Sequence, residues 1–540
     1  MRILKTLALA ASTAWVAVSG QSCNPVNATF STAAMPAGQF QPFEMLNPVV
    51  EKTSRRYFVT IVNLTPHLFK LESVDGSKMD EFSFGDVPPG RARQNPLKYR
   101  FKILVADDKT TATYAVQGAN NKQFAVRATR KLAGGHDVRR VTLDLSGMGL
   151  GSREYAFPGG QASVTLVVTG SESYGFRSSL RHGPGNWMSS IKDVIRDRPV
   201  RHLILPGTHD AGMSTITHKI ASIGSKPNTQ NQALNIHDQL RAGSRWFDLR
   251  IASIHPDLER DATKHDGFWV LHVNDETADV AVGNTGEPLD QVIDEVNRFT
   301  SQHPGEIIFF SIRYLVGRHR HPTRGPILWT QPVVDQFFAK LRGVNNRCPS
   351  LDAANNATFQ NYRAGYLMDQ NDGRGCVLLL LNGRLPDGVT HESPADGIYA
   401  LSRLALRDRW SNKMHARDVA ADQVAAWRSL ARGGPGDHDG FLISQWLVTP
   451  DAVAATVYSL ESFAVEQANP ALYFHGVNGM DPARWPNVIL VDYIGVLTRN
   501  EWARDQLGAE LYTLALGLNL YLVSENCHIQ KGTPPLIDGL

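Results

Sequence analysis

The chain has 540 residues, of which 42% are hydrophobic and 20% are charged, so it holds enough apolar material for more than one buried core. Its composition is that of a globular protein of roughly two to four domains. The formal net charge is only +3, which gives no argument for nucleic acid as a partner or for strong attraction to an anionic membrane. Beyond the N-terminal region, no segment contains the roughly 20 consecutive apolar residues needed to cross a bilayer.

The N-terminal segment has the pattern of a secretory signal peptide. Arg2 and Lys5 precede the apolar run 7–18, and small residues follow it. We therefore expect residues 1–20 to be a signal peptide and the protein to be secreted. Residues 21–49, rich in Pro, Ala, Ser and Thr, are expected to form a loose lead-in.

Two further features fit an exported chain. The four cysteines favour two disulfide bonds in an oxidising compartment. The sequence leaves their pairing open; we favour Cys348 with Cys376, which closes a local loop, and Cys23 with Cys527, which ties the termini together. Asn-x-Thr triplets, which also arise by chance, are candidate glycosylation sites at Asn27, Asn63 and Asn356.

Residues 50–172 are predicted to form an all-β domain. Short segments rich in β-branched and aromatic residues are separated by clusters of Gly, Pro, Asn and Asp, without helical periods between them. These segments are 57–62, 99–105, 113–116, 141–145 and 163–169. The spacing predicts an antiparallel β-sandwich, with a linker over 173–186. Its role is open between scaffolding, which we favour, and binding to a membrane or a glycan.

From residue 187 to residue 540, strands and helices alternate, which predicts a parallel sheet. The strand candidates are 202–205, 246–251, 268–273, 306–313, 376–381, 398–404, 441–447 and 488–493. The clearest helix is 289–302, and 329–341 and 419–431 are others. This count favours a distorted TIM-type (β/α)8 barrel over an open doubly wound sheet. The predicted fold class is therefore α/β, a barrel preceded by an all-β sandwich.

Charged residues follow several of these strands, at the end where a β/α barrel carries its active site. His209 and Asp210 come after the first strand, and Asp248 and Arg250 lie two residues apart on one face of the second. A guanidinium holds a phosphate through two hydrogen bonds, and imidazoles with a pKa near about 6.5 can take one proton and give another. The residues therefore predict acid–base chemistry on a phosphate ester. Later strands end in His272, Arg313, Arg384 and Asp492.

The same residues carry a resemblance to a known family. The motifs are Leu205-Pro206-Gly207-Thr208-His209-Asp210, Gln239-Leu240-x-x-Gly243-x-Arg245-x-Phe247-Asp248-Leu249-Arg250, Leu271-His272 and His303-Pro304-x-Glu306. Together they resemble the catalytic X region of phosphatidylinositol-specific phospholipases C, over about residues 190–500, and most closely the bacterial, metal-independent type. The resemblance implies a distorted β/α barrel that cleaves the phosphodiester of phosphatidylinositol, or of a related glycolipid at a membrane surface, by way of a cyclic inositol phosphate.

The resemblance also implies a role for each matching residue. His209 would be the general base on the inositol 2-hydroxyl, polarised by Asp492. His272 would be the general acid that protonates the diacylglycerol oxygen, with Asp210 as its partner. Arg250 would bind the phosphate, oriented by Asp248, and would replace the cation of calcium-dependent relatives, so no metal and no cofactor are implied. Contacts to the headgroup would come from Arg313, Arg384, Asp408 and Trp410.

Other interpretations of these residues stay open. Val273 follows the second histidine where the family often has glycine, and residues 255–267 look inserted. His209 could cap a turn, His272 could be a core histidine, and Asp248 with Arg250 could be a structural ion pair. The chain could then be a secreted lipid- or glycan-binding protein without turnover, or a metal-dependent phosphodiesterase of another phospholipid. A serine hydrolase is disfavoured because no Gly-x-Ser-x-Gly elbow occurs.

Overall fold

The structure is a computed structural model that describes residues 57–521. Within that range the description omits 77–78, 101–107, 134–135, 158–162, 173–174, 184, 221–225, 257–258, 321–323, 352–357, 431–439, 452–453, 455–457, 481–483 and 497–507. The predicted signal peptide and lead-in lie outside the described residues, as do Cys23, Cys527, Asn27 and Asn356. Among the helices that are described, none is long and apolar enough to cross a membrane.

The N-terminal part contains two five-stranded sheets, ordered β10-β9-β1-β4-β3 and β2-β5-β6-β7-β8. Their pairings are antiparallel, apart from the parallel pair of β1 and β9. Apolar side chains from both sheets, such as Val59, Tyr114 and Val126, join one buried cluster. The strands are β1 (Tyr57–Leu64), β2 (Phe69–Asp75), β3 (Met79–Phe82), β4 (Arg91–Tyr99), β5 (Asp108–Val116), β6 (Gln123–Ala133), β7 (His136–Asp144), β8 (Ser152–Ala156), β9 (Ser163–Ser171) and β10 (Gly175–Ser178).

Asn63 lies inside β1, where it is fully buried. Its Nδ2 atom donates hydrogen bonds to the carbonyl oxygens of His67, at 2.7 Å, and Val87, at 2.8 Å. A glycan would be attached to this same nitrogen. The prediction of glycosylation at Asn63 is therefore wrong for the folded chain, because the sugar would have no room and the amide would lose both partners.

The C-terminal part is built on a curled sheet of parallel strands, ordered β19-β18-β16-β13-β11-β22-β21-β20. No pairing joins β19 to β20 among the described residues, so hydrogen bonds do not close the sheet there. The fold is therefore mixed α/β with a curled, half-barrel sheet, which is consistent with a distorted TIM-type barrel. Its strands are β11 (Leu205–Thr208), β13 (Trp246–His255), β16 (Glu306–His319), β18 (Gly375–Gly383), β19 (Ile398–Ala400), β20 (Leu406–Trp410), β21 (Phe441–Gln445) and β22 (Val488–Val491).

One predicted barrel strand has a different place. β14 (Phe268–Val273) runs antiparallel to β13 and continues into an antiparallel extension with β15 (Gly283–Pro288) and β12 (His218–Lys219). A further short strand, β17 (Ile327–Leu328), pairs antiparallel with β16. The eighth parallel strand is instead β20, which the sequence analysis missed because its exposed, charged residues do not resemble a buried strand.

The predicted helix 289–302 is α5 (Leu289–Gln302), and its apolar stripe is buried. Helices α6 (Gln331–Leu341) and α9 (Ala416–Arg428) lie where the other helical segments were predicted. The remaining helices are shorter, apart from α14 (Glu510–Tyr521). They are α2 (Lys192–Ile195), α3 (Lys226–Thr229), α4 (Ile236–Arg241), α7 (Ala364–Met368), α8 (Gln370–Gly373), α11 (Leu460–Phe463), α12 (Asn469–Ala471) and α13 (Val477–Gly479).

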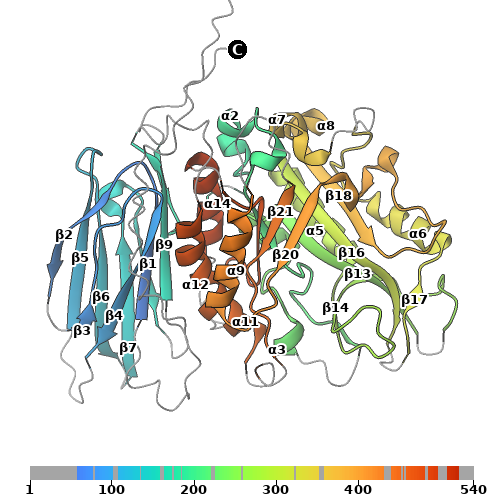
Figure 1. Ribbon diagram of the computed structural model, residues 1–540, viewed down its shortest axis with the longest axis horizontal. Coiled ribbons are helices and arrows are strands. Elements are labelled where there is room, and N and C mark those ends of the chain that lie inside the picture. Colours follow the sequence, from blue (N-terminus) through green and yellow to red (C-terminus); the bar gives the residue numbers. More distant parts are fainter. Residues whose placement is uncertain are drawn as a thin grey trace, which may run out of the picture.

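Helix α14 joins the two parts. Figure 1 shows it with α9, α11 and α12 between the N-terminal sheets and the curled sheet. One buried cluster contains Val62 of β1, Leu518 of α14 and Ile489 of β22. Gly517 permits the close approach, because a Cβ there would lie 2.8 Å from Thr169 Oγ1. Asn519 is fully buried and satisfied: it accepts from Ile204 N at 3.0 Å and donates to Ile204 O at 2.7 Å.

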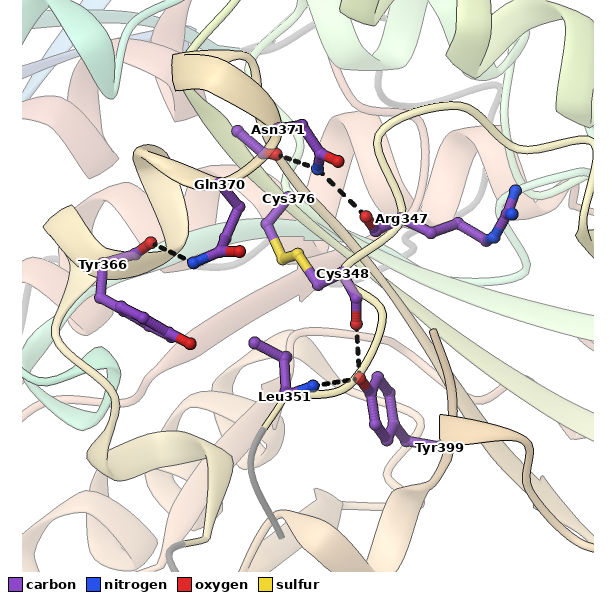
Figure 2. The surroundings of a disulfide bond; sticks show 9 residues. Arg347, Cys348, Leu351, Tyr366, Gln370, Asn371, Cys376 and Tyr399 are labelled. Carbon is purple, nitrogen blue, oxygen red and sulfur yellow. Dashed lines mark hydrogen bonds between the residues drawn. A yellow bond between two sulfur atoms is a disulfide. The ribbon is translucent and has the colours of Figure 1, made fainter. Parts of the chain in front are cut away.

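The predicted disulfide between Cys348 and Cys376 is confirmed, with the two Cα atoms 5.5 Å apart. Figure 2 shows how the loop that it closes is held. The hydroxyl of Tyr399 accepts a hydrogen bond from Leu351 N at 2.9 Å and donates one to Cys348 O. Asn371 donates to the carbonyl oxygens of Arg347 and Gly375. The disulfide thus anchors a loop to the start of β18.

Candidate active site

The turn after β11 places two predicted site residues side by side. His209 N donates to Val491 O at 3.1 Å, which continues the pairing with β22 by one residue. Asp210 then adopts a left-handed conformation, with φ at 42°, which is uncommon for a residue with a side chain. Ala211 N donates to Asp248 O at 2.8 Å, so the turn is tied to β13 on its other side.

The His209 imidazole is held at both nitrogens. Its Nδ1 lies 2.9 Å from Asp492 Oδ1, and since an ionised carboxylate only accepts hydrogen bonds, Nδ1 is the donor. Its Nε2 lies 2.6 Å from Arg250 Nη2. A guanidinium only donates, so Nε2 accepts and the imidazole in this arrangement is neutral.

Arg250 is surrounded by acceptors. Its Nε lies 2.6 Å from Asp210 Oδ1, and its Nη2 lies 3.2 Å from Asp248 Oδ2. The guanidinium carbon also lies 5.6 Å from the centre of the Tyr314 ring. Burial lowers the pKa of Arg250, but the carboxylates of Asp210 and Asp248 outweigh it and raise this pKa well above its usual value. Arg250 is therefore a fixed, fully charged cation.

Asp248 lies between two arginines. Its Oδ1 atom is 3.1 Å from Arg313 Nε, and Arg313 Nη2 in turn donates to Asp408 Oδ2 at 2.6 Å. Burial raises the pKa of Asp248, but Arg250 and Arg313 outweigh it and lower this pKa to about 2. Asp408 also accepts from Gln445 Nε2 at 2.5 Å. A row of alternating charges therefore runs from the His209 turn across to β20.

His272 reaches the same place from the antiparallel extension. It lies on β14, and its Nδ1 is 3.3 Å from Asp210 Oδ2. The other ring, that of His209, lies 3.9 Å from the same oxygen through Nε2. The direction of this strand was predicted wrongly, but His272 still lies beside Asp210.

The two histidines differ in their electrostatics. Burial lowers the pKa of His209, but Asp492 and Asp210 outweigh it, so the net shift is upward. Burial also lowers the pKa of His272; Asp210 opposes this and the charges of Arg250 and His209 reinforce it, so the net shift is downward. The two pKa shifts have opposite directions because the histidines differ in their carboxylate partners. His209 has Asp492 at 2.9 Å, whereas the nearest carboxylate to His272, that of Asp210, is at 3.3 Å.

Asn231 is a site residue that the sequence analysis missed. It is buried, and its side chain contacts Asp492 at 3.0 Å and His272 at 2.7 Å. It lies in the polar segment just after the short helix α3, and no local motif distinguishes it from neighbouring amides.

Two of the predicted headgroup residues lie apart from this cluster. Arg384 is exposed after β18 and makes no hydrogen bond or ion pair with another described residue. Trp410 is 54% exposed at the end of β20, and its Nε1 donates to Thr449 Oγ1 at 3.1 Å. Of the four, only Arg313 and Asp408 join the charged row.

Three of the site residues could in principle hold a metal ion. Ligand atoms of His209, Asp210 and Asp248 all lie within 4.8 Å of one another. Imidazole and carboxylate are ordinary ligands for divalent cations. However, Arg250 contacts all three residues at 2.6 to 3.2 Å, so its guanidinium fills the position that such an ion would take.

Comparison with known proteins points to one class. The curated relatives are PI-PLC X domain-containing proteins, so the chain matches a phospholipase C-like X-domain family. No family model matches the chain.

Human PI-PLC X domain-containing protein 1 is 26% identical over 170 residues, which cover 28% of this chain and 48% of that protein. Human PI-PLC X domain-containing protein 2 is 25% identical over 158 residues, which cover 26% and 47%. The chain thus spans about half the length of the curated relatives it matches. A mutant phosphatidylinositol-specific phospholipase C from Staphylococcus aureus has a TM-score of 0.42 at 15% identity, covering 63% of this chain and 99% of that one.

Proposed function

We propose that this protein is a secreted phosphodiesterase that cleaves phosphatidylinositol or a related glycolipid through a cyclic inositol phosphate. The observation that carries the proposal is the convergence of two imidazoles and one guanidinium on Asp210. The curated relatives support the phosphodiester as the substrate class. The signal-like N-terminus and the disulfide between Cys348 and Cys376 support an extracellular location.

Arg250 would act both on the substrate and on the base. A phosphate that enters the site competes with His209 Nε2 for the guanidinium hydrogens, and an anion is the stronger acceptor. Once Arg250 turns to the phosphate, Nε2 is free to take a proton. His209 would thereby become an active base only when the phosphate of the substrate is bound.

In the reaction, the inositol 2-hydroxyl oxygen attacks phosphorus while its proton passes to His209 Nε2. The bond from phosphorus to the diacylglycerol oxygen breaks, and His272 gives its proton to that oxygen. The products are diacylglycerol and a cyclic inositol phosphate. Arg250 stabilises the negative charge that gathers on the phosphoryl oxygens, and Asp492 stabilises the imidazolium that forms on His209.

A metal-dependent phosphodiesterase is the second candidate, because His209, Asp210 and Asp248 are close enough to share a cation. In that case Arg250 would have to leave its position between them. The lipid-binding alternative without turnover predicts binding to vesicles but no product.

The test is release of water-soluble phosphoinositol from labelled phosphatidylinositol vesicles in the presence of EDTA. We expect turnover that His209→Ala and His272→Ala each reduce by about 10²- to 10⁴-fold. His391→Ala, which changes an exposed histidine outside the site, is the matched control. Activity that EDTA abolishes and calcium restores would support the metal-dependent candidate instead. Vesicle binding without product would support the non-catalytic one.

A further inference from the structure

One buried amide contacts both His272 and Asp492, the carboxylate partner of His209. Asn231 is 1% exposed. Its Nδ2 atom lies 3.0 Å from Asp492 Oδ1, the oxygen that also accepts from His209. Its Oδ1 atom lies 2.7 Å from His272 Nδ1. The side chain therefore spans the gap between the two imidazoles.

The chemistry of these partners fixes the orientation of the amide. Asp492 only accepts, so the end of Asn231 that faces it must be the NH2 group. The other end, facing His272, is then the carbonyl oxygen, and His272 Nδ1 must be the donor. The remaining neighbours of that nitrogen are acceptors too: Thr229 O at 3.2 Å and Asp210 Oδ2 at 3.3 Å. Nδ1 of His272 thus keeps its hydrogen, and Nε2 is the atom that titrates.

The backbone around Asn231 is held between the two turns of the site. Asn231 N donates to Met213 O at 3.2 Å, and Tyr493 N donates to Asn231 O at 2.9 Å. The next residue, Gln232, donates through Nε2 to His209 O at 2.9 Å and to Val491 O at 3.1 Å. The amide is consequently fixed relative to His209 and Asp492, and any shift of it would move all three groups.

We propose that Asn231 is a positioning residue that couples the two histidines, holding His272 in the Nδ1–H tautomer and Asp492 against His209. This rests on the proposed function for its catalytic meaning. The tautomer leaves His272 Nε2 as the atom that gives its proton to the leaving oxygen. The second hydrogen bond to Asp492 keeps its Oδ1 in line with His209 Nδ1.

The first readout does not depend on activity. Nitrogen-15 NMR of the imidazoles in the full chain should show His272 as the Nδ1–H tautomer when it is neutral. Asn231→Ala should raise the share of the Nε2–H tautomer, because the closest acceptor of Nδ1, at 2.7 Å, is gone. Asn231→Asp keeps an acceptor there and should retain the tautomer, while the added negative charge raises the pKa of both histidines. Asn95→Ala removes a buried amide of the N-terminal sheet, which bonds to Val59 O, and should change neither ring.

The second readout is turnover of phosphatidylinositol. Asn231→Ala should lower kcat by about 10- to 100-fold with KM nearly unchanged, the usual effect of losing a group that orients a catalytic one. The Nε2–H tautomer of His272 in the unmodified chain would overturn the proposal, as would an unchanged spectrum in folded Asn231→Ala protein. Altered tautomers in a chain without any turnover would leave the coupling standing and overturn the proposed function.

Discussion

At the scale of single residues, the two histidines are protonated in the reverse of the order that their proposed roles need. The base, His209, has the raised pKa, and the acid, His272, has the lowered one. The productive form, neutral His209 with charged His272, is then a minority of the singly protonated enzyme. A low pKa nevertheless makes His272 a stronger acid, and the negative phosphate would raise its pKa on binding.

This arrangement predicts the pH profile. A plot of kcat/KM against pH should be bell-shaped, with one limb below and one above about pH 6.5. The reason is that the pKa of His272 is lowered and the pKa of His209 is raised from the ordinary value. Asp492→Asn removes a charge that raises the pKa of His209, so the alkaline limb should move to lower pH and the maximal rate should fall by about 10²- to 10⁴-fold. Initial rates measured between about pH 5 and 9 provide the check. A profile without limbs in that range would contradict the use of both histidines.

Arg250→Lys is expected to lose most activity although it keeps the charge. A lysine offers one compact ammonium and cannot contact His209, Asp210 and Asp248 at once while holding two phosphate oxygens. We expect a fall of about 10²- to 10³-fold in kcat, as for loss of a transition-state donor. Arg298→Lys on the exposed face of α5 is the matched control. Full activity of the Arg250→Lys variant would exclude the phosphate clamp.

The sequence predicted the residues of this site better than their electrostatics. The motif around His209 and the pair Asp248 and Arg250 are local patterns, and the structure brings them together with His272 and Asp492. The directions of the pKa shifts, and the part of Asn231, depend on distances between segments far apart in the chain. Local patterns carry no such distances.

At the scale of elements, the site combines parallel strands with an antiparallel extension. His209, Asp248 and Arg250 follow or lie on the parallel strands β11 and β13, whereas His272 lies on β14, which runs the other way. A short apolar run looks the same in either direction, so the sequence could predict a strand at 268–273 but not its orientation. It missed β20 for a related reason, since an edge strand with exposed faces has no apolar pattern.

Glu287, on β15, gives a prediction at this scale. Its side chain is fully buried, Ser214 donates to its Oε1, and Glu295 is nearby. Burial and the Glu295 charge raise the pKa of Glu287 to about 8. The folded chain therefore holds this proton more tightly than the unfolded chain does. The stability gained from it is complete below the ordinary carboxyl pKa of 4.5 and is lost as the pH rises from there to about 8.

Glu287→Gln keeps the shape and removes the titration. The variant should be more stable than the parent at pH 8, by about 1 to 4 kcal/mol, and nearly equal to it at pH 4. Urea unfolding at several pH values measures the difference. Asp294→Asn, at an exposed position on α5, is the control. A stability difference that does not grow with pH would show that Glu287 is ionised in the folded chain.

At the scale of the whole molecule, the N-terminal sheets and the curled sheet share one core through α14. Leu514 and Leu518 of that helix are buried in the cluster that contains Val62 and Val167 on one side and Ile489 on the other. The sequence predicted two separate domains, because a change from β spacing to alternating strands and helices marks a boundary along the chain. It could not reveal that a helix from the far end of the C-terminal part packs on the first sheet.

The shared core predicts that the two parts unfold together. Leu518→Ala should lower the stability by about 2 to 5 kcal/mol, as for other large-to-small changes in a core. Tryptophan fluorescence reports on the C-terminal part, which contains Trp246 and Trp446, and amide exchange in β6 reports on the other. Both signals should shift equally. Leu328→Ala, at a leucine that is 62% exposed, should shift neither, and separate transitions would disprove the common core.

The position of α14 also affects how the chain matures during synthesis. The strands that it covers, β1 and β9, leave the ribosome long before the helix does, since the whole of the curled sheet is translated in between. Until α14 has been synthesised, it cannot bury the apolar side chains of Val62 and Leu64 on β1. A nascent chain in this state exposes apolar surface that can aggregate with other chains. A chaperone that binds this surface would therefore raise the yield of native protein.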